Sequence, residues 1–185
     1  MPANLIYALN YIIDALGSII VGILLLRLLL PFLGADFRNP IAQGIFKVTS
    51  PIIAPVRRVI PAIGRLDTAT VLIAFAVQFF VLWLTTLITG QTGSFAILVF
   101  YAVIKMLTLT IMLFMFAIII SIIISWIAPG QYSPIAAIAN TLSEPVLRPF
   151  RRIIPPLGGF DISPIFAIIL LSALRIFVEG IRPFW

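Results

Sequence analysis

The sequence predicts an all-α membrane protein of about four transmembrane helices, arranged as two parallel helix–loop–helix repeats. Three observations predict this fold class. Hydrophobic residues make up 62% of the 185 residues and charged residues only 10%, whereas soluble proteins carry about 25% charged residues. Long apolar segments separate short basic ones, and the mean hydropathy is +1.23. One stretch rich in Pro, Arg, Gly and Asp occurs twice.

The apolar segments define the predicted transmembrane helices. A helix needs about 20 mostly apolar residues to cross the bilayer, and no segment shows the alternation of a membrane β-barrel strand. The predicted spans are residues 12–33, 68–89, 98–127 and 162–178. The last span is the shortest and only just reaches across the hydrocarbon layer. The sequence therefore leaves open whether it spans fully.

The repeat divides the chain into two units. A shift of 94 positions aligns residues 39–67 with residues 133–161 without a gap, and eleven of the 29 aligned positions are identical. Because an apolar segment precedes and follows each copy, both copies have the same orientation, and the repeat is parallel rather than inverted. The units and their basic loops are residues 1–94 with loop 34–67, and residues 95–185 with loop 128–161.

The basic residues predict the orientation in the membrane. Eight of the twelve Lys and Arg residues fall in the two loops, and the connection between the second and third spans, residues 90–94, has none. By the positive-inside rule both loops are cytoplasmic and both termini lie outside. This placement explains the net charge of +6 without a nucleic-acid partner.

The chain has no cysteine and no histidine. Disulfides, thiol catalysis and thiolate metal sites are therefore excluded, and the commonest metal ligand and general base are missing. We expect no cofactor, no metal and no enzymatic activity. A membrane enzyme acting on lipid is the weakest alternative, because the few carboxylates occupy positions that suit structural roles.

Each repeat begins with a predicted short amphipathic helix in the membrane interface. Asn39-Pro40 and Ser133-Pro134 each supply an N-cap side chain followed by a proline at the first helical position. The apolar residues that follow share one helical face, which we expect to point toward the acyl chains. They are Ile41, Ile45, Val48 and Ile52 in the first copy, and Ile135, Ile138, Ala139, Leu142 and Val146 in the second.

A shared structural motif follows in both copies. Its residues are Pro51, Pro55, Pro61, Gly64 and Asp67 in the first copy, and Pro145, Pro149, Pro155, Gly158 and Asp161 in the second. The second proline of each pair, Pro55 or Pro149, should stop a regular helix and leave a bent, rigid segment at the membrane surface. The glycines should turn the chain. The aspartates, or Ser163 in the second copy, should cap the next span.

The repeated pattern, NP or SP, then TSP or SEP, then PxRRxIPxxGxxD, resembles the YggT family of small bacterial inner-membrane proteins, to which YlmG-like proteins are related. The resemblance covers nearly the whole chain. It implies a multi-pass protein of the bacterial cell inner (plasma) membrane without known catalysis. It also implies a link to osmotic or extracytoplasmic stress tolerance, as in bacterial members. Plastid and Gram-positive relatives are linked to cytochrome assembly, or to cell division and nucleoid organisation.

The paired arginines form the candidate site. Arg57, Arg58, Arg151 and Arg152 lie on the proline-stiffened part of the two loops. One interpretation is that they only orient the protein in the membrane. The other is that they bind anionic phospholipid head groups or an acidic segment of a membrane-protein partner, since arginine binds phosphate bidentately. A salt bridge from each aspartate of the motif to these arginines is compatible with capping.

A few polar residues lie within the apolar segments. We expect Arg27 and Lys105 to extend their charged ends to the membrane surfaces, because a charge at the bilayer centre costs about 2.5–3.5 kcal/mol. A transport path would need these two residues together with Asp14 and Gln78, but the four map to different depths.

The sequence therefore favours a non-enzymatic inner-membrane scaffold or assembly factor, acting in envelope or osmotic stress tolerance or in the biogenesis of membrane complexes. The alternative is a channel or transporter subunit that affects ion or osmolyte flux. The pseudo-symmetric units and the few intramembrane polar groups support that alternative.

Overall fold

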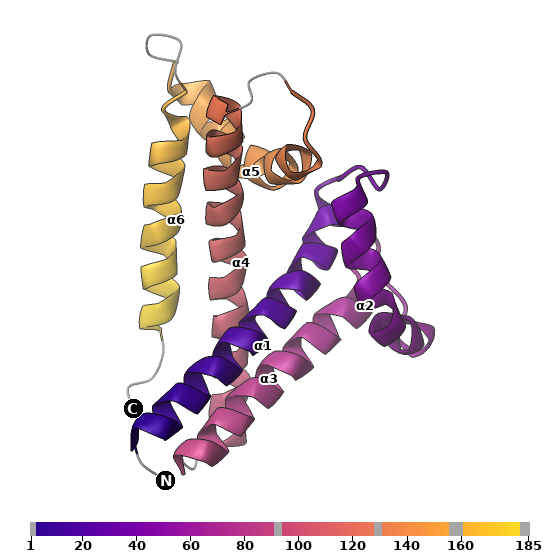
Figure 1. Ribbon diagram of the computed structural model, residues 1–185, viewed down its shortest axis with the longest axis vertical. Coiled ribbons are helices and arrows are strands. Elements are labelled where there is room, and N and C mark those ends of the chain that lie inside the picture. The colour runs from indigo at the N-terminus through magenta and orange to yellow at the C-terminus, as the bar shows by residue number, and fades with distance from the viewer. Residues whose placement is uncertain (1–2, 91–93, 128–130, 156–160, 182–185) are drawn as a thin grey trace.

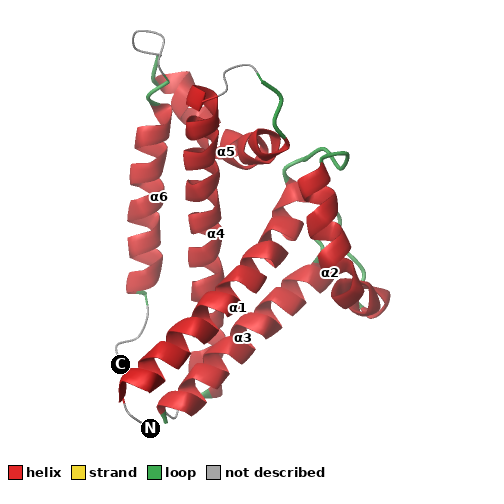
Figure 2. Ribbon diagram, viewed as in Figure 1, coloured by secondary structure: helices red, strands yellow, loops and turns green. Residues whose placement is uncertain are grey.

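The computed structural model describes residues 3–90, 94–127, 131–155 and 161–181. Its described part consists of six helices joined by loops, with no β-strand (Figure 2). The helices are α1 (Ala3–Phe32), α2 (Pro40–Val59), α3 (Thr68–Thr89), α4 (Phe95–Ile127), α5 (Pro134–Ile153) and α6 (Ser163–Gly180). The predicted all-helical fold class is confirmed.

Four of these helices are long and apolar enough to cross a membrane: α1, α3, α4 and α6. They coincide with the four predicted spans, although α1 and α4 begin earlier because apolar residues continue toward their N-termini. The fourth span forms one unbroken helix of 18 residues. At 1.5 Å per residue it extends about 27 Å, close to the thickness of the hydrocarbon layer.

Each repeat forms one helical hairpin, and the two hairpins are inclined to each other (Figure 1). In the first, α1 and α3 lie side by side; in the second, α4 lies beside α6. The short helices α2 and α5 lie at the same end of the molecule, and the start of α1 and the end of α6 lie at the other end. The two basic loops therefore share one end, as a parallel repeat requires.

The helix α4 holds the two halves together. Its buried residues Ile104, Ile111 and Ile118 recur every seven residues and pack against α5 and α6. On another side, Ala117 of α4 joins Leu30 of α1 in a cluster that also includes residues of α2 and α5. The hydrophobic core is thus continuous across the boundary between the repeats.

The N-termini of the short helices also meet. The Asn39 side chain caps α2 by accepting a hydrogen bond from the Ile41 N–H at 2.9 Å, and its amide donates to the carbonyl oxygen of Pro134 at 2.8 Å. Asn39 is only 2% exposed. One capping residue therefore starts its own helix and binds the start of the other repeat's helix.

The expectation that the prolines stop a regular helix is wrong. The helix α2 continues through Pro51 and Pro55, and α5 continues through Pro145 and Pro149. Each proline removes one hydrogen-bond donor from the helix. A residue that lies between the two prolines in the sequence is buried, and its packing supports the helix. The residues at the matching positions, Ile53 in α2 and Leu147 in α5, are 0% and 1% exposed.

The predicted apolar face of the short helices is divided rather than turned wholly toward acyl chains. Val48 and Ile52 are exposed, as expected. In contrast, Ile138 and Leu142 are buried in the cluster between the two halves, because α5 lies against α4 and against the first repeat. Part of this face is therefore a protein interface.

Candidate functional site: two arginine–aspartate junctions

In each repeat, an arginine at the end of the short helix is bound to the aspartate at the start of the next span. Arg57 Nη2 lies 2.6 Å from Asp67 Oδ2, and Arg151 Nε lies 2.8 Å from Asp161 Oδ2. In both repeats the partners are ten residues apart. We call these two groups the first and second junctions. The salt bridges between the motif aspartates and the arginines, which the sequence showed to be compatible with helix capping, are therefore present in the structure.

The same aspartates bind the starts of the helices that follow them, Asp67 as the N-cap of α3 and Asp161 from the position before Ile162, the N-cap of α6. Asp67 accepts hydrogen bonds from the Thr70 N–H at 3.5 Å and from the Thr70 hydroxyl at 2.7 Å. Asp161 accepts a hydrogen bond from the Ser163 N–H at 2.9 Å. Each carboxylate therefore satisfies otherwise unpaired groups at a helix start and also binds its arginine.

These contacts favour the ionised carboxylates. Burial alone would raise the pKa of Asp67, but the hydrogen bonds from Thr70 and Arg57 outweigh it and hold that pKa below its ordinary value. Burial opposes ionisation of Asp161 in the same way, and the hydrogen bonds from Arg151 and Ser163 lower its pKa overall. Both junctions are charged at neutral pH.

In the first repeat, a tight turn brings Arg57 and Asp67 together. In the first repeat, Pro61 follows the end of α2, and Gly64 adopts φ = +60°, which glycine tolerates without strain. Ile63 and Leu66 exchange two backbone hydrogen bonds of 3.0 Å across this turn. In the second repeat, Pro155 comes two residues after the end of α5, whereas Gly158 lies outside the described residues.

The four predicted site arginines are not equivalent. Arg57 and Arg151 are bound within the junctions. Arg58 and Arg152 are exposed, and within the described ranges neither has a hydrogen bond or an ion pair. The first arginine of each pair is thus structural, and the second is available to another molecule.

The expectation that Arg27 reaches the membrane surface is wrong. Arg27 is only 4% exposed. Its Nη1 donates hydrogen bonds to three oxygens of α2: Phe46 O at 3.1 Å, Thr49 Oγ1 at 2.6 Å and Ser50 Oγ at 3.1 Å. Its Nε lies 3.9 Å from Asp67 Oδ2. The oxygens of α2 and Asp67 supply the partners that a buried guanidinium needs, so the guanidinium turns into the protein.

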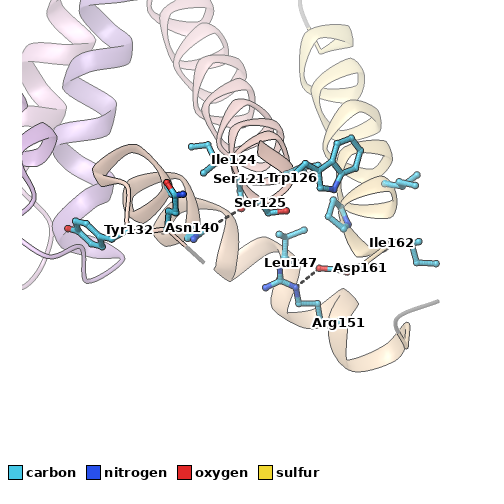
Figure 3. A pocket seen from close by; sticks show the side chains of 15 residues that line it. Ser121, Ile124, Ser125, Trp126, Tyr132, Asn140, Leu147, Arg151, Asp161 and Ile162 are labelled. Atoms are coloured by element: carbon cyan, nitrogen blue, oxygen red, sulfur yellow. Dashed lines mark hydrogen bonds and ion pairs between the residues drawn. The ribbon is translucent and has the colours of Figure 1, made fainter. Parts of the chain in front are cut away.

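The first junction has an excess of positive charge, because Arg27 and Arg57 both face Asp67, whereas the second has an excess of negative charge. Arg151 lies between two carboxylates, with Nη1 2.6 Å from Glu144 Oε2 in addition to its bond to Asp161. The residue that corresponds to Arg27 after the 94-residue shift is Ser121. Its hydroxyl donates to Asn140 Oδ1 at 2.6 Å (Figure 3). The first junction combines two arginines with one aspartate, and the second combines one arginine with two acids.

Sequence reasoning missed Ser121, Asn140 and Glu144, although a signal was present. The 94-residue shift also relates Arg27 to Ser121, outside the aligned stretch of residues 39–67. Inside that stretch it relates Phe46 to Asn140 and Ser50 to Glu144. Comparing the positions at which the two copies differ in charge would have identified Ser121 and Glu144, and the exchange of the apolar Phe46 for the polar Asn140 would have identified the third.

The remaining polar residues of the spans do not form one path. Lys105 Nζ lies 2.9 Å from Asp14 Oδ2, so these two residues pair with each other. Arg27 belongs to the first junction. Gln78 is 1% exposed, and neither atom of its amide has a hydrogen-bond partner in the described part of the chain.

The side chains at the two junctions determine which ligands the site can bind. Among the described residues, no group of three or more His, Cys, Asp or Glu side chains could bind a metal ion. The junctions offer guanidinium groups and carboxylates at one end of the spans, which suits binding of charged head groups or charged protein segments.

The fold and the junctions define a multi-pass α-helical membrane protein made of two parallel repeats. The family model of CCB3/YggT matches residues 6–88 and again residues 100–182, and both boundaries of the second match lie 94 residues after those of the first. The chain therefore belongs to the CCB3/YggT family, as the repeated motif implied.

Similar proteins occur in several bacteria and in plastids. An uncharacterised Pseudomonas aeruginosa protein is 41% identical over 170 residues, covering 91% of this chain and 86% of its own. The uncharacterised Escherichia coli protein YggT is 34% identical over 174 residues, covering 94% and 90%. YlmG homolog protein 2 of Arabidopsis thaliana chloroplasts is 40% identical over 55 residues, covering 30% of this chain and 22% of its own. No solved structure matches the chain.

Proposed function

We propose that the protein is a non-enzymatic scaffold or assembly factor of the bacterial inner membrane, and that its basic end faces the cytoplasm and is its working surface. The observation that carries this proposal is the division of labour in each arginine pair. Arg57 and Arg151 stabilise the frame, which leaves Arg58 and Arg152 exposed on it. The role we assign is tolerance of osmotic or envelope stress, or the biogenesis of membrane complexes.

The partner that suits Arg58 and Arg152 is an anionic phospholipid head group. Each exposed arginine near a negatively charged membrane surface contributes about 1 kcal/mol to binding, and the planar guanidinium can bind a phosphate through two hydrogen bonds. The stiff helices that carry both arginines reduce the entropy lost on binding. An acidic segment of a membrane protein would be recognised by the same groups.

The experiment compares two double variants of equal charge. Arg58→Gln with Arg152→Gln should lose co-purified phosphatidylglycerol or cardiolipin and fail to restore growth of a deletion strain at high osmolarity. The control, Arg38→Gln with Lys47→Gln, removes two exposed positive charges from the same loop region but leaves both arginine pairs intact. If the two double variants behave alike, the arginines only set orientation.

A second candidate function is a channel or transporter subunit, and the observation that favours it is Gln78. This amide is buried in α3 without a hydrogen-bond partner in the described part of the chain, and intramembrane polar groups often mark a path for a solute. The test is ion flux through liposomes that contain the purified protein. Flux that Gln78→Leu removes would replace the scaffold proposal.

A further inference from the structure

A cavity of about 990 Å³ lies in the second repeat, between the end of α4, the helix α5 and the start of α6 (Figure 3). Its polar lining includes Ser121, Asn140, Arg151 and Asp161, which carry the second junction. Its remaining walls are mostly apolar and include Ile124 and Ile165. The cavity therefore combines a charged part with an apolar part.

In the first repeat, a side chain occupies the position that corresponds to this cavity. Shifted back by 94 residues, Ser121, Asn140, Arg151 and Asp161 correspond to Arg27, Phe46, Arg57 and Asp67. In the first repeat the side chain of Arg27 reaches its neighbour Asp67 and is buried, 4% exposed. In the second repeat the short Ser121 stands in its place and leaves the space open.

The groups that hold the Arg27 guanidinium recur as oxygen-bearing side chains in the second repeat. Thr49 and Ser50, which accept hydrogen bonds from Arg27, correspond to Ser143 and Glu144. Neither of these two residues lines the cavity, but Glu144 adds a negative charge beside it by binding the lining residue Arg151 at 2.6 Å, and Asp161 is retained in the lining. This surrounding suits a cation better than the first repeat does, yet the chain supplies no cation equivalent to Arg27.

An anion is a poor match for the same cavity. Arg151 is the one cationic residue among the described residues that line it, and its guanidinium already lies between Glu144 at 2.6 Å and Asp161 at 2.8 Å. A phosphate or carboxylate would have to displace one of these acids. The side chain of Asp161, which lines the cavity, is 39% exposed, so this carboxylate has room for a further donor.

We propose that this cavity binds the primary ammonium head group of an aminophospholipid, such as phosphatidylethanolamine. The ammonium takes the place that the Arg27 guanidinium has in the first repeat and donates hydrogen bonds to Asp161 and Asn140, which both line the cavity. The apolar walls contributed by α4 and α6, two of the membrane-spanning helices, face the acyl chains. This site is separate from the anionic lipid contact proposed for Arg58 and Arg152.

The test uses the full chain in nanodiscs that contain phosphatidylethanolamine, phosphatidylcholine and phosphatidylglycerol in equal amounts with identical acyl chains. Native mass spectrometry after release into mild detergent then reports which lipid stays bound. One phosphatidylethanolamine should be retained about tenfold over phosphatidylcholine, the ratio expected when a charge-assisted hydrogen bond is lost. Phosphatidylcholine keeps the positive charge but has no N–H donor.

Ser121→Arg is the decisive variant, because it gives the second repeat the residue that the first repeat has. Its guanidinium should occupy the cavity and abolish the selective retention of phosphatidylethanolamine. Glu144→Gln, at an exposed position outside the lining, removes the acid that neutralises Arg151, and it should therefore reduce that retention about tenfold without affecting the fold. The matched control is Glu179→Gln, which neutralises a carboxylate in the last turn of α6, far along the helix from the cavity.

The proposal is overturned if phosphatidylcholine or phosphatidylglycerol is retained as well as phosphatidylethanolamine, or if Glu144→Gln and Glu179→Gln behave alike. It is also overturned if the wild-type protein retains no lipid but co-purifies with a basic protein segment that Ser121→Arg displaces. Size-exclusion profiles of all variants show whether Ser121→Arg is folded, and Glu144→Gln decides the outcome if it is not.

Discussion

Arg57 and Arg151 join each short helix to the span that follows it, while the neighbouring Arg58 and Arg152 extend from the same helical turns. Two adjacent residues of one type thus have different roles, because successive helical residues point about 100° apart. Only the first of each pair is turned toward the aspartate at the start of the next span.

This difference predicts unequal effects on stability. Arg57→Gln should lower the free energy of unfolding in detergent by about 1 kcal/mol, a modest loss since its side chain is 48% exposed. Arg58→Gln should leave it unchanged. Thermal unfolding followed by intrinsic fluorescence measures both. Equal melting temperatures for the two variants would contradict the structural role of Arg57.

The lowered pKa of Asp67 predicts acid sensitivity. Because the folded-state pKa lies below that of the unfolded chain, about 3.9, the ionised carboxylate stabilises the fold above that pH. This stabilisation is lost as the pH falls through the folded-state pKa. Asp67→Asn should be less stable at pH 7, and its melting temperature should fall less between about pH 5 and pH 2 than that of the wild-type protein.

At the scale of helices, α1 and α3 approach each other closely at Gly17. A Cβ added there would lie 2.5 Å from Cγ2 of Val81, whose branched side chain cannot move aside easily. Close helix contacts at small residues are common in membrane proteins. Gly22, also in α1, has nothing within 4 Å of such a Cβ.

Gly17→Ala should therefore destabilise the protein, by about 1–3 kcal/mol for an overpacked contact, and Val81→Ala should partly restore stability in the double variant. Gly22→Ala is the matched control and should be neutral or slightly stabilising, since alanine favours the helix. Thermal unfolding in detergent measures each variant. Equal losses for the two glycine variants would show that α1 and α3 are not in close contact at Gly17.

The helices α1 and α4 are joined across the two repeats by the pair of Asp14 and Lys105. Asp14→Lys or Lys105→Asp alone places two like charges together within apolar segments, so each should lower expression and thermal stability. The double variant exchanges the charges and should recover much of both. Failure of the exchange, with both singles impaired, would show that each residue acts without the other.

At the scale of the whole molecule, the parallel repeat brings α2 and α5 to one end, opposite the start of α1 and the end of α6 (Figure 1). The absence of natural cysteine allows this topology to be tested with single introduced thiols. In intact cells, a membrane-impermeant maleimide should label Ser94→Cys but should label Arg58→Cys and Arg152→Cys only after the inner membrane is opened. The reverse pattern would place the basic end outside.

Much of this architecture follows from sequence patterns alone. Hydropathy located all four spans, because each segment partitions into lipid on its own. The 94-residue shift related the two units. The same patterns misjudged α2 and α5. The helix-breaking tendency of Pro55 and Pro149 is a local property, and it was outweighed by the burial of Ile53 and Leu147 against other helices.

The sequence by itself determined that this is a membrane protein of two parallel repeats with basic loops on one side. Only the tertiary structure decided that Arg27 turns inward, that one arginine of each pair is bound, and that Ser121 leaves a cavity in the second repeat. The physical reason is that partition into lipid depends on residues close in sequence. The partner of a charge depends on which helices, tens of residues apart, are brought within a few ångströms.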